Sequence, residues 1–533
     1  MKTPLVVTTS AAYDEQVAPL VADGVAGKLA AQDPTLWGED AESESSIRLS
    51  WVGLSTSSRP LLAEIDALRA QLWSEGLDRV VLCGMGGSSL APEVISRSYD
   101  VPLTILDSTN PHVIRRAISG DLSSTVVVVS SKSGGTLETD SQRRIFVQAF
   151  EEAGIDAASR IVAVTDPGSD LKKLATEQGY RKVFLADPHV GGRYSALTAF
   201  GLVPTGLAGV DIAELLDEAE AVTGQLHADT PDNPALVLAA AIAGNAGRDK
   251  VAVTDLGSGI VDFADWAEQL IAESTGKLST GVLPVAVGPE APEVRWPASD
   301  VVVAALVSSD DAGRTPTDVG EPWATVSGTL GAQFLTWETA TAVAGRMLGI
   351  NPFDQPDVES AKKAARGLLD ARPEDEPAQV TEGGIEARGS AGLLDGVDTI
   401  AGAIDALLGR LGPDGYLAVM AYVDSERDAA LHGVRDTLSR RTERPTTFGW
   451  GPRFLHSTGQ YHKGGPPQGV FLQVTSTEED DVQIPDRPFT FGTLIKAQAA
   501  GDAGVLAEHG RPVLRLHLLD PATGVATLVD LLR

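Results

Sequence analysis

The chain has 533 residues, of which 43% are hydrophobic and 22% are charged, and it carries a formal net charge of −31 at pH 7. This composition excludes a disordered chain and is sufficient for two packed domains. The negative charge repels nucleic acid and acidic membranes, so we expect neither as a partner, and a bound phosphate requires a local cluster of cations. The single cysteine, Cys83, excludes an internal disulfide and reads as a small core residue.

Targeting signals are missing from the sequence as given. No apolar run is long enough to span a bilayer, and the segment Met1–Pro4 lacks the basic and then apolar layout of a secretory signal. We therefore expect a cytoplasmic protein.

The chain order of apolar segments predicts an α/β fold. Residues 1–75 read as a helical lead-in, because Ile65, Leu68 and Leu72 recur at helical spacing. Short apolar runs then alternate with longer amphipathic stretches, which is typical of an open parallel sheet covered by helices. The expected strands of this first series are Val80–Cys83, Leu103–Leu106, Val126–Val129, Ile161–Val164 and Val183–Leu185.

A second series of apolar runs follows. Its expected strands are Val251–Val253, Leu283–Val287, Val301–Leu306, Tyr416–Val423, Val470–Val474 and Val513–Leu518. We predict two doubly wound parallel-sheet halves, residues 76–215 and residues 216–533. The acidic, Pro-rich stretch 372–377 and the pair Gly383-Gly384 read as a surface loop.

Two loops rich in small residues follow two of the predicted strands. The first strand leads into Gly84–Ser89, and the run Val126–Ser130 leads into Ser131–Thr136. Small residues let backbone N–H groups approach an anion, and a following helix directs its positive end at the ligand. The alternative, that these residues only make tight turns, weighs about the same for either loop alone but less for the pair. The glycine pattern fits neither a dinucleotide fingerprint nor a nucleotide P-loop.

A glutamate is predicted near the end of the helix 265–275, which Gly276 stops. Trp266, Leu270 and Glu273 fall on one face of this helix, so we expect the carboxyl group to be buried. Burial and the helix dipole would raise its pKa and suit it to proton transfer. A buried ion pair with a Lys or Arg is an equally weighted alternative.

Two further segments carry candidate cations. Arg193 follows Gly191-Gly192 at the apparent start of a helix, where its guanidinium can bind an oxyanion or can lie on the surface. Gln355 and Lys362 lie seven residues apart in a turn that leads into a helix, so both can face one pocket. The alternative is that Asp357 only caps this helix while Lys362 is solvated.

Two of the eight histidines, His456 and His462, lie in a polar, glycine-rich segment. Imidazole is the side chain best suited to moving a proton near neutral pH. The histidine spacing elsewhere does not match a metal site, so we predict no bound metal.

These segments together resemble the glucose-6-phosphate isomerase family, whose halves are sugar-isomerase (SIS) domains. The resemblance runs from about residue 45 to the C-terminus. It is carried by five segments: Gly84–Ser89, Ser131–Thr139, Gly191–Ser195, Glu273–Lys277 and Asn351–Pro356.

The resemblance implies reversible isomerisation of glucose 6-phosphate to fructose 6-phosphate through a cis-enediol, without a cofactor. Glu273 would move the proton between C2 and C1, with Arg193 near the reacting carbons and with Gln355 and Lys362 on the C1 and ring-oxygen side. The sugar phosphate would be held by Gly87, Ser88, Ser131, Lys132, Ser133 and Thr136. Relatives commonly form dimers that share the active site, which implies a homodimer.

The histidine that opens the sugar ring is implied to be His456, with His462 as the second candidate. The segment His456–Tyr461 resembles one found in short bacterial isomerases, but here it follows Lys362. We therefore expect residues 440–533 to fold back beside residues 245–370. This order of segments also resembles the isomerase half of transaldolase–isomerase fusions. The roughly 45 residues that precede the region of resemblance are too few for a transaldolase barrel.

Two alternative functions remain open from the sequence. One is a broader isomerase that also accepts mannose 6-phosphate. The other is a non-catalytic sugar-phosphate sensor of the SIS type, which would have no need for Glu273, Arg193, Lys362 and a histidine together.

Overall fold

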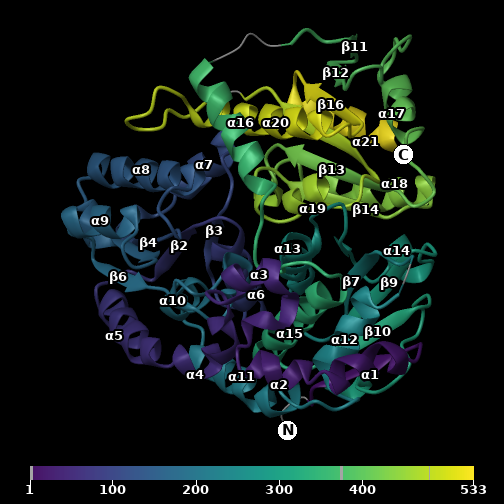
Figure 1. The fold of residues 1–533 in the computed structure, drawn as a ribbon. Coiled ribbons are helices and arrows are strands. Elements are labelled where there is room, and N and C mark those ends of the chain that lie inside the picture. Colours follow the sequence, from purple (N-terminus) through teal and green to yellow (C-terminus); the bar gives the residue numbers. More distant parts are fainter. Residues whose placement is uncertain (1–3, 246, 372–375, 479) are drawn as a thin grey trace.

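The computed structural model describes residues 4–245, 247–371, 376–478 and 480–533, and in the helix 358–371 the side chains of residues 358–362, 370 and 371 are not described. Its strands form three sheets with helices packed around them (Figure 1). In the described ranges, no helix is long and apolar enough to cross a membrane.

The first sheet is parallel throughout and has the order β3-β2-β4-β5-β6. Its strands are β2 (Arg79–Cys83), β3 (Thr104–Leu106), β4 (Thr125–Ser130), β5 (Ile161–Thr165) and β6 (Lys182–Leu185). The five predicted strands are therefore confirmed to within one residue at each end. The central strand β4 is buried along its whole length, because helices cover both faces of the sheet. These helices are α6 (Leu90–Ser98), α7 (Pro111–Ile118), α8 (Leu137–Glu152), α9 (Asp170–Glu177) and α10 (Ala199–Ala208).

The second sheet has the order β1-β10-β9-β7-β8. Its parallel strands are β7 (Lys250–Leu256), β8 (Leu283–Ala286), β9 (Val301–Val307) and β10 (Trp323–Ser327). The edge strand β1 (Val6–Thr9) pairs antiparallel with β10, so the helical lead-in begins with a strand that the sequence pattern did not predict. The helices around this sheet are α11 (Ile212–Leu226), α12 (Pro234–Ala243), α13 (Phe263–Thr275), α14 (Pro292–Arg295) and α15 (Leu330–Met347).

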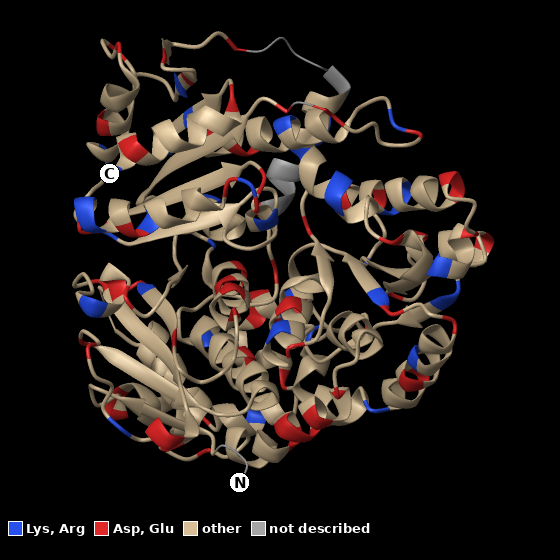
Figure 2. Ribbon diagram, turned by 180° about the vertical axis from the view of Figure 1, so that it is seen from behind, with Lys and Arg blue, Asp and Glu red and all other residues tan. Residues whose placement is uncertain are grey.

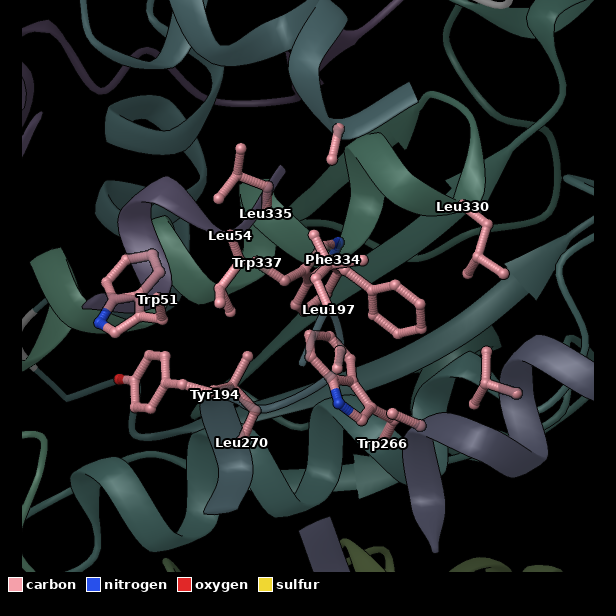
Figure 3. Close-up of a cluster of buried hydrophobic side chains, with 14 of the residues drawn as sticks. Trp51, Leu54, Tyr194, Leu197, Trp266, Leu270, Leu330, Phe334, Leu335 and Trp337 are labelled. Atoms are coloured by element: carbon pink, nitrogen blue, oxygen red, sulfur yellow. The ribbon is translucent and has the colours of Figure 1, made fainter. Parts of the chain in front are cut away.

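The rest of the lead-in is helical. It contains α1 (Asp14–Ala22), α2 (Val25–Ala30), α3 (Glu39–Ser45), α4 (Leu54–Ser57) and α5 (Pro60–Ser74). Its Trp51 stacks on Tyr194, with ring centroids 5.0 Å apart, in the large aromatic and aliphatic core between the first two sheets (Figure 3). Trp266 and Phe334 meet edge to face in the same core, with ring centroids 4.7 Å apart. This shared core fixes the first two sheets relative to each other.

The third sheet contains strands that we expected to belong to the same half as the strands of the second sheet. Its order is β11-β12-β16-β15-β13-β14, and the strands are β11 (Val380–Glu382), β12 (Ile385–Gly389), β13 (Tyr416–Tyr422), β14 (Thr446–Trp450), β15 (Gly469–Ser476) and β16 (Val513–Leu518). The region 216–533 therefore holds two sheets. Alternation of strands and helices predicts that strands exist, but it does not specify which strands share hydrogen bonds.

Part of the predicted surface loop is a hairpin in this third sheet. Gly383 and Gly384 join β11 to β12 and both have positive φ, as a two-residue hairpin turn requires. Residues 372–375 of the predicted loop lie outside the described residues.

The helices of the C-terminal region lie around the third sheet (Figure 1). They are α16 (Val358–Ala371), α17 (Ile400–Leu408), α18 (Val434–Thr442), α19 (Gly459–Gly464), α20 (Phe491–Glu508) and α21 (Pro521–Leu532). Phe491 and Leu494 of α20 join the core under the first sheet, and Tyr416 joins a core with Leu283 and Val285 of the second sheet. The third sheet thus packs against the second sheet directly and is linked to the first sheet through α20.

Charged residues of both signs are interspersed along the helices and loops in the view of Figure 2. The net charge of −31 is therefore not accompanied in this view by a separate basic face. Attraction of an anion therefore depends on local cations near the ends of the strands.

Candidate active site

The two predicted phosphate loops lie side by side at one edge of the first sheet. The strands that precede them, β2 and β4, are paired and parallel, so both loops leave the sheet at its carboxyl edge. This is the edge at which ligands bind in open parallel sheets. Residues Gly86–Ser88 form a short 3-10 helix, η3, in which the Ser88 amide donates to the Met85 carbonyl at 3.1 Å.

Gly87 lies against the arginine segment. A Cβ at position 87 would lie 2.1 Å from the Gly192 carbonyl oxygen, so this close approach requires glycine. The Ser195 hydroxyl donates to the Gly87 carbonyl at 3.1 Å. The first phosphate loop and the segment that carries Arg193 are therefore in direct contact.

The second loop is organised by its own hydroxyl groups. The Ser131 hydroxyl lies 3.3 Å from the Thr136 hydroxyl and accepts from the Gly134 amide at 3.1 Å. The Ser133 hydroxyl accepts from the Gly135 amide at 3.1 Å. The helix α8 begins directly after Thr136, so its positive end adjoins the loop.

Lys132 joins this loop to the segment before Arg193. Its ammonium group donates to the carbonyl groups of Pro188 and Val190 and lies 3.6 Å from an Asp166 carboxylate oxygen. Burial lowers the pKa of Lys132, while Asp166 opposes this shift. The cation is thus placed at the carboxyl edge of the first sheet.

Arg193 is buried, with 3% of its surface exposed, on the short 3-10 helix η6 (Gly192–Tyr194). Its Nε donates to the Ser274 hydroxyl at 2.8 Å, and its Nη2 donates to the carbonyl groups of Pro352 and Asp354 at 2.6 and 3.0 Å. Its Nη1 donates to the Gln355 side-chain oxygen at 3.1 Å. The guanidinium therefore holds the segment 352–355 against the end of α13.

Glu273 lies in the last turn of α13, and 5% of its surface is exposed. The predicted helix and its end at Gly276 are confirmed, and Trp266 and Leu270 are buried on the same helix. The Glu273 Oε2 lies 3.7 Å from Nη1 of Arg193. The sequence predicted a buried carboxylate here, and the structure gives this carboxylate a fixed guanidinium neighbour.

A second buried cation, Lys277, supports the same segment. Its Nζ donates to the carbonyl groups of Asn351 and Asp354 and to the Asp354 carboxylate, at 2.7, 2.6 and 2.6 Å. Burial, together with the charge of Arg193, lowers the pKa of Lys277 to about 8. Gln355 is exposed at the end of this segment, apart from its bond to Arg193. The side chain of Lys362, predicted to face the same pocket, lies outside the described residues.

His456 comes from the C-terminal region, at the end of the 3-10 helix η9 (Arg453–His456). Its carbonyl oxygen accepts from the Gln269 side chain of α13 at 2.7 Å, and a Cβ on Gly86 would lie 2.8 Å from that same oxygen. The histidine is therefore held between the first phosphate loop and the helix that carries Glu273.

The side chain of His456 contacts the carboxylate of Glu138, a residue to which the sequence pattern assigned no role. The His456 Nε2 lies 3.1 Å from Glu138 Oε1, and Glu138 is buried in the first turn of α8. The helix dipole favours a carboxylate at that position. Glu138 lies within the segment Ser131–Thr139. Its partner His456 is over 300 residues away in the sequence, so residue spacing does not predict the contact.

The structure does not support a substrate contact for His462. Its ring is 3% exposed and packs against the rings of Tyr416, Phe454 and Phe471. Neither ring nitrogen has a hydrogen-bond partner among the residues that the structure describes, and burial lowers the pKa of His462 well below its usual value. This histidine is a core residue of α19, because α19 turns that face toward the third sheet.

A cavity of about 1100 Å³ lies elsewhere, at the carboxyl ends of β7, β8 and β9. Its charged lining comprises five aspartates against two arginines and a histidine: Asp255, Asp262, Asp265, Asp311, Asp436, Arg314, Arg435 and His432. Such a lining disfavours a phosphate group. We therefore place the candidate site at the first sheet, where Arg193, Lys132 and the two loops meet.

The described part of the chain contains no group of three or more His, Cys, Asp or Glu residues arranged to hold a metal ion. The side chains that meet at the site supply a buried carboxylate, a fixed guanidinium, an imidazole paired with a second carboxylate, and two loops rich in small residues. These groups can bind an anion and move protons on a bound sugar.

Part of the chain is similar to a known protein family. Residues 68–297 match the phosphoglucose isomerase family. Glucose-6-phosphate isomerase of Citrifermentans bemidjiense is 37% identical over 211 residues, which is 37% of this chain and 40% of that protein. Glucose-6-phosphate isomerase of Synechococcus elongatus is 30% identical over 348 residues, which is 55% of this chain and 66% of that protein. The chain thus spans less than two thirds of the length of these relatives.

A solved structure shows the same fold. The crystal structure of a glucose-6-phosphate isomerase from Chlamydia trachomatis superposes with a TM-score of 0.55 and 20% identity, over 68% of this chain and 86% of that chain. The likeness shows that the two proteins share an α/β fold. Within this chain, the match to the phosphoglucose isomerase family covers the first sheet and part of the second.

Proposed function

We propose that this protein interconverts glucose 6-phosphate and fructose 6-phosphate. One observation carries the proposal: the buried carboxylate of Glu273 lies 3.7 Å from the fixed guanidinium of Arg193, next to the loops that suit a phosphate. A proton base beside a stabiliser of negative charge is what an aldose–ketose isomerisation requires. A protein that only senses sugar phosphates has no need for this pair.

The reaction begins with the closed ring of the sugar. In the proposal, His456 donates a proton to the ring oxygen as the ring carbon–oxygen bond breaks, and the anomeric hydroxyl group loses its proton to solvent. The Glu138 carboxylate lies 3.1 Å from His456 Nε2 and holds the imidazole in place.

Proton transfer then proceeds on the open chain. Glu273 removes the proton from C2 while O1 gains a proton from solvent, which gives a cis-enediol. Glu273 then returns the proton to C1 while the O2 hydroxyl group loses its proton to solvent. Arg193 stabilises the negative charge that develops on the enediol oxygens. A preorganised donor of this kind typically contributes about 3 to 4 kcal/mol to the transition state.

Binding of the substrate rests on the loops. Gly87, Ser88, Ser131, Ser133 and Thr136 supply backbone and hydroxyl donors for the phosphate, with Lys132 adjacent. We assign the ring-oxygen and C1 side to Gln355 and Lys362 on the resemblance alone. No cofactor enters this mechanism.

The proposal also covers the localisation, the oligomeric state and the partners of the protein. We propose a cytoplasmic enzyme that acts as a homodimer, without nucleic acid or membrane partners. The net charge of −31 supports the absence of polyanionic partners. We also propose that residues 76–215 form the domain that binds phosphate.

The proposal is tested by following glucose 6-phosphate formation from fructose 6-phosphate in purified protein. Sustained conversion, which glucose 6-phosphate dehydrogenase reports as NADPH, is the expected result. Binding of either sugar phosphate without conversion would favour the sensor instead. Parallel conversion of mannose 6-phosphate would extend the substrate range.

A further inference from the structure

Glu138 accepts two hydrogen bonds on one carboxylate oxygen. The first is from His456 Nε2 at 3.1 Å, and the second is from the side-chain amide of Gln498 at 2.7 Å. Gln498 belongs to α20 and is 4% exposed. A buried glutamine from the C-terminal region therefore touches the carboxylate that pairs with the candidate ring-opening histidine.

The hydrogen bonds determine which way the Gln498 amide faces. An ionised carboxylate only accepts hydrogen bonds, so the Gln498 NH₂ group must point to Glu138. The Gln498 oxygen then faces the Thr109 hydroxyl, which lies 2.7 Å away and must donate. Thr109 is fully buried, just after β3, so its hydroxyl has a fixed setting.

The chain of donors runs from Thr109 through Gln498 to Glu138, and His456 donates to the same carboxylate from the other side. This arrangement places the His456 proton on Nε2. The other ring nitrogen, Nδ1, has no hydrogen bond to any residue in the described ranges and is available to a ligand.

We propose that Gln498, oriented by Thr109, is a positioning residue that fixes the Glu138 carboxylate so that His456 presents Nδ1 to the ring oxygen of the substrate. This inference rests on the proposed isomerase function and assigns a role to α20 within it. The C-terminal region then contributes both the histidine and the group that orients its partner. In metal sites, removal of the polar partner of a histidine typically changes affinity or activity by about 10- to 100-fold, and we expect an effect of similar size here.

Two variants separate this role from simple packing. Gln498→Leu removes the donor and keeps most of the volume. Gln498→Glu keeps the shape and places a second carboxyl group against Glu138. We expect both variants to lower kcat for fructose 6-phosphate by about 10-fold or more while KM changes less than about threefold.

The sharper readout compares ring opening with proton transfer. A sugar phosphate too short to close a ring bypasses His456, so its exchange of the carbon-bound proton with solvent should change less than about threefold in both variants. Equal slowing of the ring-closed and acyclic substrates would overturn the positioning role, and so would wild-type rates with both.

Gln333→Leu is the matched control for losing a buried glutamine. Gln333 is fully buried on α15, where it donates to the Val326 carbonyl and accepts from Trp337. This variant should lose stability without a change in the ratio of the two rates. An equal change in that ratio would overturn the role of Gln498.

A second readout does not depend on activity. Nitrogen-15 NMR of labelled histidines should show His456 as the Nε2-protonated tautomer at a pH where its ring is neutral, and a mixture of tautomers in Gln498→Leu. An unchanged tautomer in that variant would overturn the inference. If the wild-type protein shows no isomerisation but this tautomer effect is present, the proposed function fails while the orienting contact stands.

Discussion

Nη1 of Arg193 and Oε2 of Glu273 lie 3.7 Å apart, and both side chains are buried. The four other bonds of the guanidinium, to Ser274, Pro352, Asp354 and Gln355, leave it little freedom to move. The sequence left two interpretations of Glu273, a proton-transfer base and a buried ion pair. At this distance the two are compatible, because a carboxylate paired with a fixed cation can still act as the proton acceptor.

Arg193→Lys should lower kcat by about 100-fold or more, because a lysine cannot reproduce the planar set of donors that the guanidinium offers. Steady-state kinetics with fructose 6-phosphate measure this effect. Lys182→Arg, at an exposed ion pair with Glu64, is the control and should retain wild-type activity. A kcat for Arg193→Lys close to the wild-type value would contradict charge stabilisation by the guanidinium.

Gly87→Ala should destabilise the protein by about 1 to 3 kcal/mol, because the added Cβ would lie 2.1 Å from the Gly192 carbonyl oxygen. It should also weaken phosphate binding, since the loop must move. Denaturant unfolding and binding of fructose 6-phosphate provide the measurements.

Gly191→Ala is the matched control for that substitution. The nearest atom to an added Cβ is 3.9 Å away, and the backbone at this position has an ordinary φ of −70°. Its free energy of unfolding should stay within about 0.5 kcal/mol of the wild type. If the two alanine variants had equal stability, the close contact at Gly87 would be disproved.

Glu268 predicts a specific dependence of stability on pH. Burial raises the pKa of this glutamate to about 8, so the folded protein binds a proton that the unfolded chain releases near the usual pKa of 4.5. Stability is therefore lost as the pH rises from the unfolded pKa to the folded one. Glu268→Gln should remove much of this loss, which is on the order of a few kcal/mol between about pH 5 and about pH 9.

Denaturant unfolding of both proteins at these pH values checks the Glu268 prediction. Glu177→Gln, at an exposed position at the end of α9, is the control and should leave the pH profile unchanged. Identical pH profiles for Glu268→Gln and the wild type would show that Glu268 titrates normally in the folded state.

His456→Ala should slow the conversion of ring-closed sugar by about 100-fold or more and affect an acyclic substrate much less, because only ring opening needs the imidazole. Comparison of the two substrates in stopped assays measures the difference. His462→Phe, which preserves an aromatic ring in the core, should retain activity. The reverse result, with His462→Phe impaired and His456→Ala active, would exchange the two assignments.

Much of the fold was predictable because it depends on local sequence. The strands of the first sheet, the loops after β2 and β4, and the end of α13 at Gly276 follow from apolar periodicity and glycine positions. The third sheet was not separated from the second, and β1 was missed, because strand pairing is decided by contacts between distant segments.

In the candidate site, too, local sequence predicts some features, whereas others depend on contacts between distant segments. Burial of Glu273 follows from its position on a helix face, but the Glu138–His456 pair joins residues over 300 positions apart, which no local pattern predicts. His462 looked accessible because polar residues and glycines surround it in the sequence. In the fold it lies on the side of α19 that faces Tyr416 and Phe471, so its ring is enclosed.

The most direct test of proton transfer by Glu273 uses glucose 6-phosphate labelled with deuterium at C2. The wild-type protein should produce fructose 6-phosphate in which part of the label has moved to C1 and the rest has exchanged with solvent, as proton NMR would show. Glu273→Gln should bind the sugar phosphate but form product at least about 1000-fold more slowly. Label transfer at the wild-type rate in Glu273→Gln would contradict the central claim that this carboxylate carries the proton.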